Sequence, residues 1–246
     1  MSQANSRWPR NVVLVGTAVA VAAVLVACGL WFGRASIQGA TPEERMREIR
    51  DVARNRPWGT DETLARAAVS DADAACRQVA LVCLAQNPSP KSRAYVEQAT
   101  HDPSPGVRAA AAATLGLYHD DAALKRLSEM ALDDAEPQVR LGAVTGLGRH
   151  RSPVALVWLL ETAERDKELE VTLQAIATIY HRLGMRYIGA QVEAVDARTA
   201  ALMVVENLKD DVTISKAYEK AGRAPVRNPQ YYVPPLGEPD PRQGMR

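Results

Sequence analysis

The chain has 246 residues, of which 30 are Lys or Arg and 29 are Asp or Glu, so its formal net charge at pH 7 is only +1. A nucleic-acid groove or a polybasic membrane surface needs clustered positive charge, and this balance argues against either as the main purpose of the protein. Phe32 is the single phenylalanine, so a soluble core would have to be built from Ala, Leu, Val and Ile.

Residues 1–11 form a short N-terminal tail, and residues 12–32 follow as twenty-one residues without a charge. At ~1.5 Å per residue in a helix, this stretch is about as long as the hydrocarbon core of a bilayer is thick. Trp8 near one end, and Trp31 with Phe32 at the other, place aromatic rings where they suit the membrane interface. The segment is therefore predicted to be a single transmembrane helix that anchors the chain in the cell membrane.

A lipoprotein signal is the alternative for the same segment. Leu25-Val26-Ala27-Cys28 resembles a bacterial lipobox, in which cleavage before the cysteine would leave Cys28 as a lipidated N-terminus. The basic leader, the apolar stretch and the small residues before the cut would also suit a signal peptide that is removed altogether. Each alternative implies targeting to a membrane, and we expect the rest of the chain to lie outside the cytoplasm.

Residues 33–40 form a spacer that leads to a specific helix start. Thr41 is followed by Pro42 and by Glu44, which is a capping box with proline at the first helical position. The helix to about Arg56 carries five arginines, which would suit a lipid-headgroup patch, but the interleaved acidic residues favour a solvated face. We expect this helix to be the N-terminal cap of the domain that follows.

An internal repeat occupies the middle of the chain. The pattern Asp102, Val107, Arg108, Ala111, Leu115, Gly116 recurs 32 residues later as Asp134, Val139, Arg140, Ala143, Leu147, Gly148. Partial copies lie 31 residues before the first unit, at Asp71 and Arg77, and 32 residues after the second, at Asp166 and Thr172, where threonine replaces the arginine. This period is typical of stacked helical pairs, because one such module cannot bury its apolar face alone.

Each repeat unit is predicted to contain two helices. The apolar residues of the first helix are four apart, which places them on one stripe, and a second apolar pattern follows. Ser89-Pro90 and Ser152-Pro153 would start second helices with an N-cap hydroxyl and a proline, as Ser104-Pro105 would start a first helix. The sequence therefore predicts an all-α fold.

An Asp-containing turn followed by Val-Arg-x-x-Ala-x-x-x-Leu-Gly resembles the HEAT repeat family, in particular its short bacterial, phycobilisome-lyase-type variety, over about residues 60–195. The resemblance implies a right-handed α-solenoid of HEAT-like helical pairs over residues 41–222. It also implies that the arginine of each repeat reaches the Asp-containing turn or an adjacent helix end, which would form a ladder along the stack. The ladder residues would be Arg77, Arg108, Arg140, Asp71, Asp102 and Asp134.

Candidate catalytic or metal-binding residues are few. His119, His150 and His181 are 31 residues apart and would follow the first helices of successive repeats in a row, but helices ~8 to 10 Å apart are too distant for ligands that must each reach ~2 Å from one zinc ion. Cys76 and Cys83 lie about two turns apart on one helix, too far for a disulfide, and are expected to be buried apolar residues. No phosphate loop, carboxylate pair or catalytic triad stands out, so no catalytic residue, metal or cofactor is predicted.

The C-terminal part departs from the repeat. After expected helices at about residues 200–208 and 214–221, residues 223–246 form a proline-rich tail that cannot continue as helix. Its aromatic and apolar groups on an extended backbone are typical of a segment that docks on a partner, and a disordered tail is the alternative. The candidate partner-binding residues of the tail are Tyr231, Tyr232, Pro234 and Pro235.

The sequence thus predicts a noncatalytic, membrane-anchored scaffold whose repeats bind a protein partner, because solenoids offer extended surfaces for such contacts. Nucleic acid is not an expected partner. Two alternatives remain. One is a lipoprotein of an envelope complex anchored at Cys28, and the other is an enzyme subunit of the bilin-lyase type with a small-molecule site on the concave face, which rests on the repeat type alone.

Overall fold

The computed structural model describes residues 35–185, 196–228 and 230–231, and the regular elements of this part of the chain are α-helices. The helices are α2 (Pro42–Asn55), α3 (Thr60–Ser70), α4 (Ala74–Gln86), α5 (Arg93–Ala99), α6 (Pro105–Leu115), α7 (Asp121–Asp133), α8 (Pro137–Arg149), α9 (Ala155–Arg165), α10 (Leu169–Leu183), α11 (Ala197–Leu208) and α12 (Val212–Lys220). The predicted all-α architecture is confirmed for these residues.

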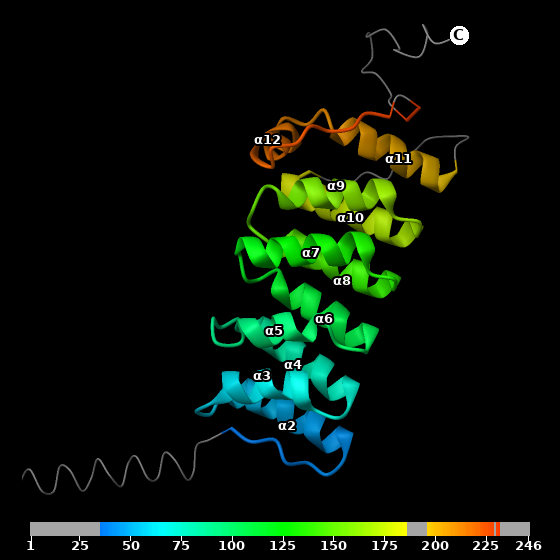
Figure 1. Cartoon of the computed structure of the whole chain (residues 1–246). Coiled ribbons are helices and arrows are strands. Elements are labelled where there is room, and N and C mark those ends of the chain that lie inside the picture. Colours follow the sequence, from blue (N-terminus) through cyan, green and yellow to red (C-terminus); the bar gives the residue numbers. More distant parts are fainter. Residues whose placement is uncertain (1–34, 186–195, 229, 232–246) are drawn as a thin grey trace, which may run out of the picture.

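The helices form an elongated stack of two layers (Figure 1). In the first layer α2, α4, α6, α8 and α10 pack on one another in that order, and in the second layer α3, α5, α7 and α9 lie beside them. Helices of consecutive units also contact each other across the layers, as α3 does with α4 and α7 with α8. This arrangement is that of an α-solenoid, in which each unit completes the core of its neighbours.

Helix α2 begins where the sequence predicts. The Thr41 side chain accepts a hydrogen bond from the Glu44 N–H (3.2 Å), and the Glu44 carboxylate accepts one from the Thr41 N–H (3.1 Å), which completes the capping box. α2 lies at the N-terminal end of the stack, as expected of a cap. It also occupies a first-layer position and pairs with α3, so it takes the place of the first helix of a further unit.

The two predicted starts of second helices at Ser-Pro are too early, because α5 begins at Arg93 and α9 at Ala155. The two serine hydroxyls do accept the N–H two residues further on, as expected of a cap: Ser89 from Lys91 (3.3 Å) and Ser152 from Val154 (3.3 Å). The next residues form a tighter turn, in which the Ser92 N–H donates to the Ser89 carbonyl (3.0 Å) and the Ala155 N–H to the Ser152 carbonyl (3.2 Å), and the α-helix begins after that turn. Ser104-Pro105 does start α6.

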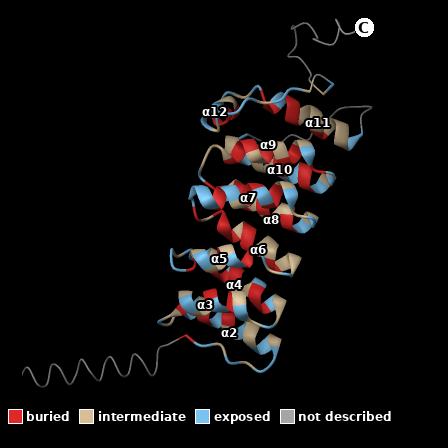
Figure 2. Ribbon diagram, in the orientation of Figure 1, coloured by how far each residue is buried: buried red, intermediate tan, exposed pale blue. Residues whose placement is uncertain are grey.

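The core between the layers consists of small and branched aliphatic side chains. Buried residues are coloured red on the ribbon in Figure 2 and occur along the helices of both layers. The stripe of Val107, Ala111 and Leu115 on α6 is fully buried, as is the equivalent stripe on α8. Leu124 and Leu127 of α7 face the same core. Buried alanines allow the layers to approach closely, which suits a chain with few aromatic residues.

Glycine sets the separation of α6 and α8. A Cβ atom at Gly142 would lie 2.4 Å from the carbonyl oxygen of Ala109, and one at Gly146 would lie 2.4 Å from that of Ala112. Real Cβ atoms do not approach backbone oxygens so closely, so these two positions of α8 can hold only glycine at this helix separation.

The C-terminal end of the stack is closed by α11 and α12, which both contact α9. Residues 223–228 then run back along α11, and we call them the C-terminal strap. The buried Lys209 ammonium donates to the Val226 carbonyl, and Arg227 donates to the Asp210 carboxylate (2.6 Å). Of the candidate tail residues, Tyr231 is half-buried in a turn, and Tyr232, Pro234 and Pro235 lie outside the described residues.

No helix within the described residues is long and apolar enough to cross a membrane. The predicted transmembrane segment, residues 12–32, and the lipidation candidate Cys28 both lie outside those residues, so the membrane anchor remains a prediction.

Candidate functional site

Arginine–aspartate pairs connect successive units along one edge of the stack. In each pair, Nε and Nη2 of an arginine on a first-layer helix donate to the two carboxylate oxygens of an aspartate at the next turn. For Arg77 and Asp102 these distances are 2.6 and 2.8 Å. Within the described residues the four pairs are Arg45–Asp71, Arg77–Asp102, Arg108–Asp134 and Arg140–Asp166. Two parallel hydrogen bonds fix the geometry of such a pair as well as its charge.

The third nitrogen of each ladder arginine binds the turn of its own unit. Arg108 Nη1 donates to the carbonyls of Asp102 (3.0 Å) and Pro103 (3.3 Å), while the rest of the guanidinium holds Asp134 of the next unit. Arg140 repeats the pattern one unit further on. One side chain therefore satisfies two otherwise unpaired carbonyls and joins two repeats.

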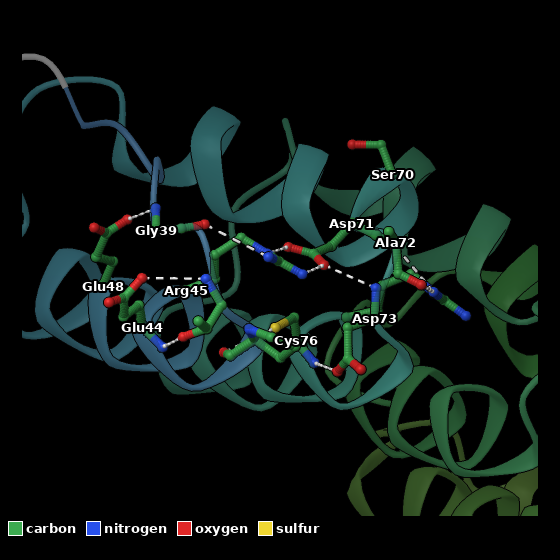
Figure 3. Close-up of polar contacts among 12 residues, drawn as sticks. Gly39, Glu44, Arg45, Glu48, Ser70, Asp71, Ala72, Asp73 and Cys76 are labelled. Carbon is green, nitrogen blue, oxygen red and sulfur yellow. Dashed lines mark hydrogen bonds and ion pairs between the residues drawn. The ribbon is translucent and has the colours of Figure 1, made fainter.

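Each ladder aspartate also orders its own turn. Figure 3 shows the first rung, in which the Arg45 guanidinium lies against the Asp71 carboxylate and Asp71 Oδ1 also accepts the N–H of Asp73 (2.9 Å). Burial opposes ionisation of Asp71, but the hydrogen bonds from Arg45 and Asp73 outweigh it, so the pKa of Asp71 lies below its usual range. The pKa values of the other predicted ladder aspartates, Asp102 and Asp134, are lowered for the same reasons.

Two ladder residues were not among those proposed from the sequence. Arg45 lies on the helix that was expected only to cap the stack, and it reaches Asp71 just as Arg77 reaches Asp102. Asp166 closes the last rung with Arg140, and its side chain is 2 % exposed. Arg45 and Asp71 are 26 residues apart, as are Arg108 and Asp134, and this spacing is the sequence signal that would have identified Arg45.

The ladder ends at Thr172, which stands where earlier units have arginine. The Thr172 hydroxyl is buried and has no hydrogen-bond partner in the described part of the chain. The carbonyls that this arginine would have bound are instead taken by Arg198 from α11, which donates to Asp166 O and Lys167 O. A side chain from the next helix thus replaces the missing one.

The histidines and cysteines have structural roles. His181 lies inside the last turn of α10, so the expectation that it follows its helix is wrong. His150 is buried, meets the His119 ring edge-on at 5.6 Å, and uses both nitrogens: Nδ1 accepts the Ser152 N–H, and Nε2 lies 3.2 Å from the Asp120 carbonyl. These contacts suit a neutral ring that carries its proton on Nε2.

The two cysteines of α4 are buried free thiols, as predicted, and burial raises the pKa of both Cys76 and Cys83. Among the residues that the structure describes, no group of three His, Cys, Asp or Glu side chains is placed to hold a metal ion.

An open groove of about 910 Å³ crosses the second layer at α7, α9 and α12. These three helices follow one another along the stack (Figure 1). Residues 121–129 of α7, the start of α9 and the end of α12 line the groove, together with the loops that contain His119 and His150. Leu124, Val154 and Trp158 give it an apolar floor. The sequence did not reveal this groove, because its walls come from three segments that only the fold brings together.

Basic side chains surround this groove. Lys125, Arg151 and Lys220 line it, and their side-chain nitrogens form no ion pair or hydrogen bond with the described residues. Asp121 and Glu129 also line it, but Glu129 is bound by Arg126 (3.4 Å).

The comparison with known families agrees with this architecture. Residues 62–144 match the family model of HEAT repeats, which confirms the predicted HEAT repeats over this part of the chain. The match covers three ladder aspartates, and the Arg140–Asp166 rung carries the same geometry beyond it. No curated protein sequence matches the chain. HEAT repeats commonly mediate protein–protein interactions, and the fold therefore indicates an interaction scaffold.

Proposed function

We propose that the protein is a membrane-tethered, noncatalytic scaffold whose HEAT repeats bind a protein partner. The observation that carries this proposal is the open, partly apolar groove on a stack whose repeats are rigidly joined by bidentate ion pairs. A binding surface gains specificity when rigid elements hold its side chains in place. The charged side chains of the ladder are paired with one another inside the stack. The basic side chains around the groove remain available to bind a partner.

A binding role for the groove agrees with the environment of its buried histidine. A hydrolytic site needs a nucleophile, a free base and an orienting group within hydrogen-bond reach of one another. His150 is the buried histidine of the groove, and its ring nitrogens are already engaged by backbone groups. It therefore fixes the α8–α9 loop and is not available as a base.

The membrane tether rests on the sequence of residues 12–32. We propose a single-pass anchor with the repeats outside the cytoplasm. A lipoprotein linked through Cys28 is the second candidate, and the lipobox-like Leu25-Val26-Ala27-Cys28 favours it. In both cases the spacer would hold the stack close to the membrane surface.

The test is a crosslinked pull-down of the full-length protein from detergent, with mass spectrometry of the captured proteins and of the N-terminus of the bait. We expect a reproducible protein partner and an intact Met1 for the transmembrane anchor, or a lipidated Cys28 for the lipoprotein. A bait that loses residues 1–32 and stays in the soluble fraction would contradict the tether. Absence of any reproducible partner across independent crosslinkers would contradict the scaffold.

A further inference from the structure

We propose that the groove across α7, α9 and α12 binds an extended peptide segment of another protein, in which acidic side chains alternate with apolar ones. This inference rests on the proposed scaffold function and names the chemistry of its partner. It is carried by the arrangement of apolar and charged groups around the groove.

The floor of the groove selects apolar side chains. Trp158 is half-buried on α9, and its ring lies beneath the Arg223 guanidinium, whose Cζ is 4.9 Å from the ring centroid. Arg223 is in turn held by Glu161 (2.8 Å). The ring is therefore fixed before a partner arrives, and a fixed aromatic surface is the type of anchor that contributes strongly to binding. Leu124 and Val154 extend the same apolar floor.

The rim selects negative charge. Lys125 on α7, Arg151 in the α8–α9 loop and Lys220 at the end of α12 come from three different elements and lie around one groove. Each lacks an ionic partner among the described residues. Two acidic residues, Asp121 and Glu129, also line the groove, and Glu129 is bound by Arg126. The charge around the floor is thus positive, and charge complementarity favours a ligand with carboxylates.

The shape favours a peptide over a compact small molecule. The groove is open along one side, whereas small-molecule sites bury most of the surface of their ligand. Three neighbouring helices at ~8 to 10 Å separation span roughly 16 to 20 Å. An extended chain covers that distance with about five or six residues at ~3.3 Å each. The occupant is therefore a short linear segment.

The experiment is selection of a phage-displayed library of random peptides on the full-length protein in detergent. We expect the enriched peptides to share one or more acidic residues next to apolar or aromatic ones. Their affinity should fall by about tenfold or more for the triple variant Lys125→Glu, Arg151→Glu, Lys220→Glu, because each substitution brings like charges together. Lys216→Glu, an exposed position one turn from Lys220 on the same helix, is the matched control and should leave the affinity unchanged.

The outcomes are distinct. Enrichment of peptides without acidic residues, or equal binding by the triple variant with an unchanged melting temperature, would overturn the inference. Peptides that match residues 233–240 would assign the groove to the C-terminal tail of this protein itself and would also overturn the inference. If the partner from the crosslinked pull-down is still captured by the triple variant, the scaffold function stands and the groove assignment fails.

Discussion

Arginine side chains join each repeat to the next because one guanidinium has enough donors to reach two turns at once. In the ladder, Nε and Nη2 bind the aspartate of the following unit while Nη1 binds carbonyls of its own unit. Lysine, with a single ammonium, could not make the same set of contacts. Arg182 uses the same capacity elsewhere: it donates to the carbonyls of Leu147, His150 and Ser152 and so caps the end of α8.

The ladder arginines are predicted to stabilise the stack unequally. Arg108→Ala and Arg140→Ala should each lower the free energy of unfolding by about 1 to 3 kcal/mol, because each leaves a partly buried carboxylate without its cation and two carbonyls without a donor. The larger loss is expected for Arg140→Ala, since Asp166 is 2 % exposed and Asp134 is 14 % exposed. Urea denaturation followed by circular dichroism measures both. Arg165→Ala, which removes an exposed arginine outside the ladder, is the control. Unchanged unfolding of both ladder variants would show that the ladder does not stabilise the stack.

His150 is predicted to make stability depend on pH in a defined window. Burial lowers the pKa of His150 in the folded protein, and the nearby His119 and Arg182 lower it further. The hydrogen bond with the Asp120 backbone raises this pKa, but the lowering effects are larger. The unfolded chain therefore takes up a proton first as the pH falls through about 6.5. The free energy of unfolding should be insensitive to this group above about pH 7 and should decrease below about pH 6.5. The pKa of His119 is also lowered, so it contributes in the same direction.

The measurement is the melting temperature of the wild type and of His150→Gln at pH 7.5 and pH 5.5. Glutamine retains a donor for the Asp120 carbonyl but does not titrate. The melting temperature of His150→Gln should therefore fall less between pH 7.5 and pH 5.5 than that of the wild type. His181→Gln, at an exposed position, should behave as the wild type does. An equal pH dependence in all three proteins would show that His150 is not the titrating group.

At the scale of the helices, the sequence predicted most of the elements because the repeat places apolar residues at helical spacing. The stripes on α6, α8 and α10 are buried as expected. Helix starts at Ser89 and Ser152 were misplaced because a serine before proline can close a turn as well as cap a helix. The groove was missed for a different reason: Leu124, Trp158 and Lys220 are far apart in the chain, and no local pattern records that α12 packs on α9.

The close contact of α6 and α8 is predicted to require glycine at particular positions. Gly146→Ala should destabilise the protein by about 1 to 3 kcal/mol, because the added methyl group meets the backbone oxygen of Ala112, which cannot move without shifting α6. Gly106→Ala is the matched control. Its Cβ would lie 3.4 Å from the flexible end of Gln78, so the helical preference of alanine should stabilise the protein by up to about 1 kcal/mol. Thermal unfolding of the two variants tests the difference, and an equal effect would contradict the proposed close contact.

On the scale of the whole molecule, the stack is held by contacts between neighbours, so its stability should vary along its length. The middle units are joined on both sides by ladder rungs and by the close approach of α6 and α8. The C-terminal end depends on a different device. The Lys209 ammonium is fully buried, 2.8 Å from Glu206 and 3.1 Å from Glu164, and it also holds the C-terminal strap through the Val226 carbonyl.

Lys209→Met is therefore predicted to loosen the C-terminal end without unfolding the middle of the stack. Removal of the ammonium leaves the Glu206 carboxylate, which is 2 % exposed, without its nearest cation, and breaking a buried pair in this way costs about 3 to 5 kcal/mol. Hydrogen exchange measured by mass spectrometry should accelerate in α11, α12 and the C-terminal strap, and remain slow in α6 and α8. Lys216→Met, at an exposed position of α12, should change neither region. Because α12 forms one wall of the groove, Lys209→Met should also lower the affinity for the peptides selected on the wild type. Equal acceleration along the whole chain would instead show that the stack unfolds as a single cooperative unit.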